Sequence, residues 1–240
     1  MGIVIIGLVL IVGVILLYVF LSIQGKRRDT ALLQTVTDTW RGTWSEQALI
    51  LKLLKQGVPA VTVFHDLYIE KRTNQYAQID AVILTKVGII VFEVKDYSGW
   101  IFGKGYQDYW TQVLAYGKER YRFYNPIMQN KRHIEALRWK LSGIADVPFY
   151  SVIIFYGPCT LRDVSCIPEG TYVGYSEDIM SIVDFIIANN LPADYQDKWG
   201  VINVLKEATS LGNNPDVVSQ HIQNIYNCQK SYSRYRTFGT

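Results

Sequence analysis

Two charged residues, Glu93 and Lys95, stand at the end of an apolar run that reads as a buried β-strand. Side chains alternate between the two faces of a strand, so these two charges point the same way. Asp80 interrupts a second apolar run, and a tight connection at residues 86–88 would place it opposite Glu93 or the next residue. Cross-strand neighbours lie about 5 Å apart. The spacing therefore predicts that two carboxylates and one ammonium group meet at one end of a hydrophobic hairpin.

This cluster needs a compensating charge. Buried like charges repel one another, and each costs several kcal/mol to remove from water. A hard divalent cation such as Mg²⁺ binds carboxylate and carbonyl oxygens and keeps part of its water shell. The cluster therefore favours a divalent cation at Asp80 and Glu93. The alternative is a solvated strand end beside a turn, but that does not explain why Asp80 also interrupts an apolar strand.

Apolar patterning predicts the elements that position these groups. We expect Ser45 to cap a helix that ends near Gly57, and Pro126 to open a second helix after Asn125. The order of elements predicts an α/β fold in which a mixed central β-sheet is flanked by helices. The expected strands cover residues 61–69, 76–85, 89–95, 100–102, 109–116, 148–156 and 171–174, with further helices over 177–189, 195–209 and 214–229 and a loop over 159–170.

The N-terminal segment, residues 1–25, is uniformly apolar, and no charged residue precedes Lys26. About 20 apolar residues span the hydrocarbon core of a bilayer. A cleaved signal peptide would have a basic start and a shorter apolar core. The basic cluster at residues 26–28 follows the apolar run, and positive charges stay on the cytoplasmic side. We expect one transmembrane helix with its N-terminus outside and the remaining domain in the cytoplasm.

Composition sets wider limits. Hydrophobic residues make up 49% and charged residues 19% of the 240 residues, which excludes a disordered chain. The net charge of +3 permits a polyanionic partner without requiring one. The three cysteines have no metal-binding spacing and form a poor disulfide framework, so a reducing compartment is the simpler interpretation. No phosphate-binding loop motif is present, and ATP use is unsupported.

The motifs and their order resemble the PD-(D/E)XK nuclease superfamily, and most closely its nuclease-related (NERD) branch. The family usually has Gly before the first-helix glutamate, where this chain has Ser45. The resemblance covers roughly residues 40–150 and implies a restriction-endonuclease-like fold. The matching segments are RGTWSE at 41–46, QID at 78–80, FEVKDYSG at 92–99, Gly103, Trp110 with Gln112, and NPIMQN at 125–130.

The resemblance implies the roles of the site residues. Asp80 and Glu93, with the carbonyl of Val94, would bind Mg²⁺ or Mn²⁺, and Glu46 would complete the acidic set through a metal-bound water or a second metal. Lys95 would orient or deprotonate the attacking water. Gln112 would steady that water or the lysine. The implied activity is a metal-dependent nuclease that hydrolyses phosphodiester bonds, with DNA the favoured substrate.

We divide the chain into a transmembrane anchor at 1–25, a juxtamembrane linker at 26–40, a nuclease-like domain at 41–190 and a helical extension at 191–240. Its expected partners are nucleic acid and, through the anchor, the membrane. Two other functions remain open: a catalytically silent module of the same fold that binds nucleic acid or protein, and a membrane-tethered adaptor.

Several of these residues also have simpler explanations. Glu46 suits the first turn of any helix, and Gln112 suits the polar face of an alternating strand. The dipeptide His65–Asp66 lacks the second histidine cluster that a metal site would need. Trp100 and Trp110 fit packing better than base stacking. Basic residues of the second predicted helix fit either phosphate contacts or an ordinary solvated face: Lys131, Arg132, Arg138 and Lys140.

Overall fold

The computed structural model describes residues 2–72 and 75–237, with side chains described for residues 10–71 and 75–227. Its larger sheet has five strands in the order β1-β2-β3-β7-β9. The first three form an antiparallel meander, and β3, β7 and β9 run parallel. The predicted mixed α/β fold is thereby confirmed. The strands are β1 Val63–Arg72, β2 Gln75–Thr85, β3 Gly88–Asp96, β7 Phe149–Tyr156 and β9 Thr171–Tyr175.

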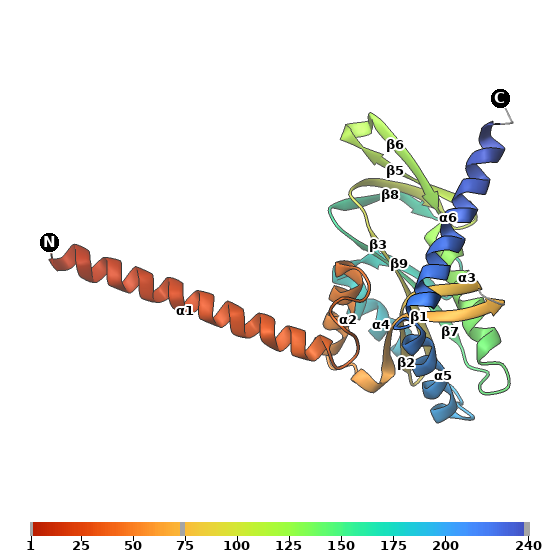
Figure 1. Ribbon diagram of the computed structural model, residues 1–240, viewed down its shortest axis with the longest axis horizontal. Helices are drawn as coiled ribbons and strands as arrows, with labels where there is room; N and C mark the ends of the chain where they lie inside the picture. The colour runs from red at the N-terminus through yellow and green to blue at the C-terminus, as the bar shows by residue number, and fades with distance from the viewer. Residues whose placement is uncertain (1, 73–74, 238–240) are drawn as a thin grey trace.

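A second sheet of four strands lies beside the first, in the order β6-β5-β4-β8 (Figure 1). The prediction of a loop over residues 159–170 was wrong for residues 159–165, which form β8 and pair in parallel with β4. The strand is mostly solvent-facing, so its sequence lacks a clear apolar alternation. The strand at β6 was not predicted for the same reason. The strands are β4 Gly99–Lys104, β5 Tyr109–Leu114, β6 Glu119–Tyr124 and β8 Cys159–Ser165.

Helices cover both faces of the larger sheet. Helices α2 (Trp44–Lys55) and α4 (Ile179–Asn189) share one apolar cluster with the sheet, and α3 (Pro126–Lys140) and α5 (Lys198–Leu211) share another. A last helix, α6 (Pro215–Thr237), crosses the domain and reaches up beside the smaller sheet (Figure 1). The sheet is thus buried on both sides, which explains the long apolar runs in β2 and β3.

Helix caps agree with the sequence in one case and differ in the other. Asn125 caps α3 by accepting the N–H of Ile127, with Pro126 in the first turn. For α2, the predicted cap Ser45 was wrong. The cap is Thr43, whose hydroxyl accepts the N–H of Glu46, so Ser45 lies inside the first turn.

The first helix, α1 (Gly2–Leu33), is longer than predicted. Residues 26–33, expected to belong to a linker, continue the helix without a break. Its C-terminal end packs on α2 through Leu33, and Asp29 forms an ion pair of 2.7 Å with Lys55. The segment Leu10–Leu33 contains an 18-residue window with a mean hydropathy of 1.6, none of which is buried in the domain, so the helix is long and apolar enough to cross a membrane. Figure 1 shows it standing out from the domain.

An aromatic cluster joins the two sheets. The indole of Trp110 on β5 is fully buried and stacks on Phe155 of β7, with ring centroids 6.2 Å apart. Gly103 on β4 makes room for this indole, because a Cβ at that position would lie 2.2 Å from a ring carbon. The inner face of the smaller sheet is therefore fixed against the end of β7, close to the charged end of β3.

Candidate active site

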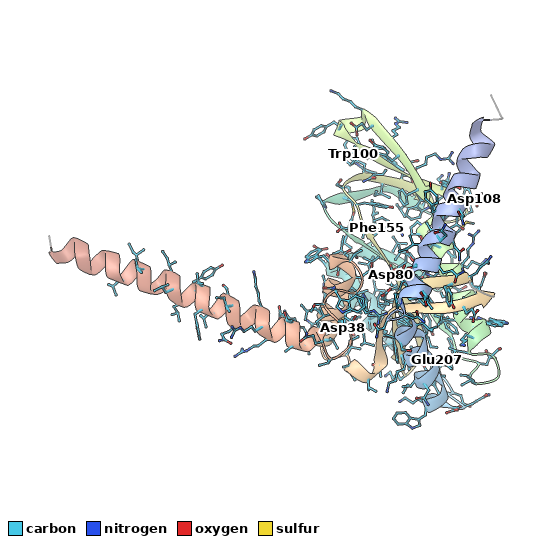
Figure 2. All side chains as sticks on the ribbon, in the orientation of Figure 1. Asp38, Asp80, Trp100, Asp108, Phe155 and Glu207 are labelled. Atoms are coloured by element: carbon cyan, nitrogen blue, oxygen red, sulfur yellow. The ribbon has the colours of Figure 1, made fainter. Side chains whose placement is uncertain are left out.

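Asp80 lies where β2 and β3 separate. The antiparallel ladder between them ends at the pair Ala81 and Phe92. One step further, the side chain of Asp80 accepts the N–H of Val94 at 2.7 Å, in the place of a backbone acceptor. Figure 2 shows Asp80 in the body of the domain, with Phe155 between it and Trp100 of the smaller sheet in this view. The predicted hairpin geometry thus brings Asp80 to the charged strand end.

Glu93 and Lys95 contact each other on one face of β3. The Glu93 carboxylate is 1% exposed, and its Oε1 accepts from Lys95 Nζ at 2.5 Å. Lys95 also donates to Oε1 of Gln129 at 3.1 Å, and Nδ1 of His133 lies 3.4 Å from the second carboxylate oxygen of Glu93. Gln129 and His133 are four residues apart on α3 and so face the same way. One face of α3 therefore closes over the end of β3.

Glu46 reaches the site from the first turn of α2. Its Oε1 accepts from the hydroxyl of Thr43 at 2.7 Å, and its Oε2 lies 3.5 Å from Nε2 of His65 on β1. The other ring nitrogen of His65 pairs with the hydroxyl of Thr37 at 2.8 Å. Gly42 has a φ of +68°, and a Cβ there would lie 2.6 Å from both Glu46 and His65. The turn before α2 therefore requires glycine to let these two side chains meet.

The pKa shifts of the three acidic side chains show that these groups influence one another. Burial, followed by the charges of Glu93 and Glu46, raises the pKa of Asp80 well above its usual range. Burial also raises the pKa of Glu93, although Lys95 opposes this. For Glu46, burial would raise the pKa, but His65 and Thr43 outweigh it and the pKa is lowered. The structure thus brings Glu46, Asp80 and Glu93 close enough to repel one another.

Lys95 and His133 respond to the same surroundings. Burial would lower the pKa of Lys95, but Glu93 and Asp80 outweigh it and raise the pKa. Burial, with smaller effects from Lys71 and Lys95, lowers the pKa of His133 to about 3. Lys95 is therefore a charged ammonium at neutral pH, and His133 is a neutral imidazole.

A neighbouring carboxylate, Asp66, is fully paired and serves as a contrast. It lies on β1 between two residues that pair with β2 on either side of Asp80. Arg41 donates to its side chain at 3.1 Å and to its carbonyl at 2.6 Å, and Gln78 donates to its other carboxylate oxygen at 2.8 Å. Asp66 is therefore a structural residue that anchors the turn before α2.

The structure places Gln112 away from Lys95. It lies on β5 in the smaller sheet, where it donates to the carbonyl of Ser98 at 2.9 Å, and Gln129 contacts Lys95 in its place. Val94 is buried and pairs with Ile154 of β7, and its N–H donates to Asp80; the role of its carbonyl as a metal ligand stays a prediction. The sequence alone did not assign Gln129, His133 or His65 to the site. The four-residue spacing of Gln129 and His133 places both on one face of a helix, and this spacing could have indicated that they act together.

The acidic side chains of the site fit a divalent cation in part. Among the residues that the structure describes, no group of three or more His, Cys, Asp or Glu side chains is arranged to hold a metal ion. However, Oε2 of Glu46 and Oε2 of Glu93 are buried, and each has only a histidine ring nitrogen nearby, at 3.5 and 3.4 Å, without hydrogen-bond geometry. Buried charged oxygens without partners are costly, and oxygen donors of this kind suit Mg²⁺ and Mn²⁺. The donor chemistry fits a hard cation, although Lys95 takes one oxygen of Glu93.

Comparison with known proteins gives two matches. Residues 41–156 match the family model of the nuclease-related domain, the family that the motifs predicted. The chain is also 24% identical over 188 residues to an uncharacterized protein of Bacillus anthracis, a match that covers 78% of this chain and 85% of the relative. No solved structure matches significantly. The matched range runs from the turn before α2 to the end of β7 and includes Glu46, Asp80, Glu93 and Lys95.

We expect Asp80→Asn to raise the free energy of unfolding, by about 1 kcal/mol or more, when divalent cations are absent. The change removes one of three mutually repelling carboxylates and keeps an oxygen that can accept the Val94 N–H. Urea unfolding of the full chain in detergent with EDTA measures the effect.

The matched control is Asp66→Asn on the adjacent strand. It should lower the free energy of unfolding by about 3 kcal/mol or more, because Arg41 would stay buried without its counter-charge. If both variants lost stability equally, mutual repulsion at Asp80 would be ruled out.

Proposed function

Because residues 41–156 form a nuclease-related domain, we propose that this chain is a divalent-metal-dependent nuclease that hydrolyses phosphodiester bonds of nucleic acid, DNA in particular. One observation carries the proposal: Asp80 and Glu93 lie beside a single ammonium group, Lys95, at a strand end, and the charge of Glu46 acts on both carboxylates. Three separate elements deliver these groups. A cluster with this electrostatic cost is typical of catalytic sites rather than of structural ion pairs.

Carboxylate oxygens of Asp80, Glu93 and Glu46 would hold Mg²⁺ or Mn²⁺, with the Val94 carbonyl as the further ligand that the family resemblance implies. When bound, such a cation polarises a phosphoryl oxygen and makes hydroxide available near neutral pH. The unpartnered oxygens of Glu46 and Glu93 support their assignment as ligands.

Lys95 acts through its positive charge in this mechanism. Glu93 and Gln129 hold its ammonium group, and the nearby carboxylates keep its pKa above the usual value. A lysine that stays protonated at neutral pH is a poor base. It is suited to orient the attacking water and to offset negative charge on the phosphorane as that charge develops. We therefore favour orientation and charge stabilisation over proton abstraction.

We also propose that α1 tethers the domain to a membrane. The apolar segment Leu10–Leu33 is long enough to span a bilayer, and the basic residues at 26–28 favour a cytoplasmic domain with the N-terminus outside. A tethered nuclease would act on nucleic acid that comes close to the membrane.

The competing function is a catalytically silent module of the same fold. One observation favours it: Lys95 occupies an oxygen of Glu93, and the acids of the described residues do not form a closed ligand set. Such a module would bind nucleic acid or a protein partner without turnover.

A cleavage assay separates the two functions. The full chain in detergent is incubated with supercoiled, linear and single-stranded DNA and with RNA, in Mg²⁺, Mn²⁺ or EDTA. We expect cleavage that needs the cation and that falls about 100-fold or more in Glu93→Gln and Lys95→Ala. Circular dichroism controls for folding. Binding without cleavage by the wild-type chain would establish the silent module, and equal activity of the variants would dismiss this site.

Substitutions of Gln129 and Gln112 test which of these two residues steadies Lys95. Gln129→Ala should lower kcat about tenfold, because one hydrogen bond to the ammonium group is lost at a cost of about 1.4 kcal/mol. Gln112→Ala should change kcat less than about twofold, since its hydrogen bond is to Ser98. Steady-state kinetics of both variants measures this, and the reverse order of effects would restore Gln112 to the site.

The membrane orientation is tested by labelling cysteines in intact cells. All three cysteines follow residue 28, and Cys166 is exposed. A membrane-impermeant maleimide should label the chain only after the cells are permeabilised. The matched control is Gly2→Cys in a chain whose own cysteines are alanine, which should be labelled in intact cells. Labelling in the opposite pattern would reverse the topology, and extraction by alkaline carbonate would refute the anchor.

A further inference from the structure

The outer face of the smaller sheet carries aromatic and basic side chains. Cross-strand register fixes which residues share a face. Trp110 on β5 and Phe123 on β6 pair with each other and point inward, where Trp110 stacks on Phe155. Residues of the opposite alternation therefore point outward. They are Trp100 on β4, Tyr109 on β5, and Arg120, Arg122 and Tyr124 on β6.

Each of these aromatic rings lies beneath an arginine. The guanidinium of Arg122 is 4.9 Å from the ring centre of Tyr109, and that of Arg132 on α3 is 4.9 Å from Tyr124. At the opposite edge of the sheet, Arg162 of β8 lies 4.8 Å from the ring of Trp100. The rings of Tyr109 and Tyr124 also meet edge to face at 6.0 Å. Aromatic and cationic groups thus alternate over this surface.

In the part of the chain that the structure describes, none of the ion pairs includes Arg120, Arg122, Arg132 or Arg162. A guanidinium that stacks on a ring keeps its N–H donors in its own plane, where they can bind an anion. The arginines of this sheet and its two acidic residues, Glu119 and Asp163, lie on the two edge strands, and the central strands carry no acidic residue. With Arg132 of α3 added, the surface carries more basic than acidic side chains and is able to take planar groups.

We propose that this arginine–aromatic face, formed by Trp100, Tyr109, Tyr124, Arg120, Arg122, Arg132 and Arg162, binds a single strand of nucleic acid and leads it to the candidate active site. This inference rests on the proposed function for its biological meaning. Unpaired bases stack on aromatic rings and on the planes of the guanidinium groups that cover them, whatever the sequence, and the N–H edges of the arginines bind the phosphates. A duplex hides its bases, so the face should prefer single strands.

One further cation connects this face to the site. Arg132 lies on α3 three residues from Gln129, which contacts Lys95, and residues three apart on a helix are neighbours. Arg132 and Lys71 also line one cavity of about 390 Å³ beside α3, together with Glu135. A strand bound on the face would therefore pass Arg132 to reach the carboxylates.

Anionic lipid is the other partner that arginine and aromatic side chains fit. Nucleic acid is favoured because the rings lie on three successive strands of one sheet, and because Arg132 belongs to the helix that contacts Lys95 rather than to α1.

The test measures binding separately from cleavage. The full chain carrying Lys95→Ala, in detergent with EDTA, is titrated into a fluorescent oligothymidylate, and anisotropy is followed at increasing salt. Arg122→Gln and Arg132→Gln should each weaken binding and reduce the salt slope by about 0.7. Tyr109→Leu with Tyr124→Leu should weaken binding about tenfold without changing that slope. Lys86→Gln, an exposed cation at the β2–β3 turn, is the matched control and should have no effect.

The outcomes also separate this inference from the proposed function. Binding that falls in the face variants supports the inference even if the wild-type chain never cleaves. Binding unchanged in all variants overturns it, even if the wild-type chain is an active nuclease. Preference for a DNA duplex, or binding of anionic phospholipid vesicles with none of the oligonucleotide, also overturns it.

Discussion

Asp80 and Glu93 share one ammonium group where β2 and β3 separate, and Glu46 adds a third negative charge to this site. The rest of the domain is built around the cost of that arrangement. Burial and mutual repulsion raise the pKa of both Asp80 and Glu93. The fold keeps the acids in place through contacts that do not themselves carry charge: the Val94 N–H on Asp80 and the Thr43 hydroxyl on Glu46. The apolar ladder behind them resists the repulsion, because a buried hydrophobic sheet does not relax easily. Stability is thus lowered at the site for which we propose a divalent cation.

Much of this could be predicted from the sequence, because strand alternation is a local property. Glu93 and Lys95 had to share a face, and the short turn had to bring Asp80 beside them. The partner Gln129 could not be found in this way. Its spacing from His133 shows that both share a face of α3, but only tertiary packing decides that this face turns toward β3.

Gln112 illustrates the opposite limit. Its alternation with apolar neighbours indicated correctly that it lies on a strand, but the strand belongs to a second sheet that the pattern did not separate from the first. β8, which completes that sheet, contributes only a few side chains to the core, so its apolar period was too weak to recognise. The predicted cap of α2 was wrong because Thr43 and Ser45 are both good cap residues, and only the backbone conformation shows that Thr43 is the cap.

The arginine–aromatic face is basic and the candidate site is acidic, so binding at one affects binding at the other. A nucleic-acid strand on the arginine–aromatic face would pass Arg132, yet its phosphates would then meet Glu46, Asp80 and Glu93. Phosphates and desolvated carboxylates repel strongly, and Lys95 alone offsets only one of these charges. A divalent cation reverses the sign of the site, so cation and substrate should each bind more tightly in the presence of the other. In a chain whose net charge is only +3, this local coupling, rather than the overall charge, would determine where a strand comes to rest.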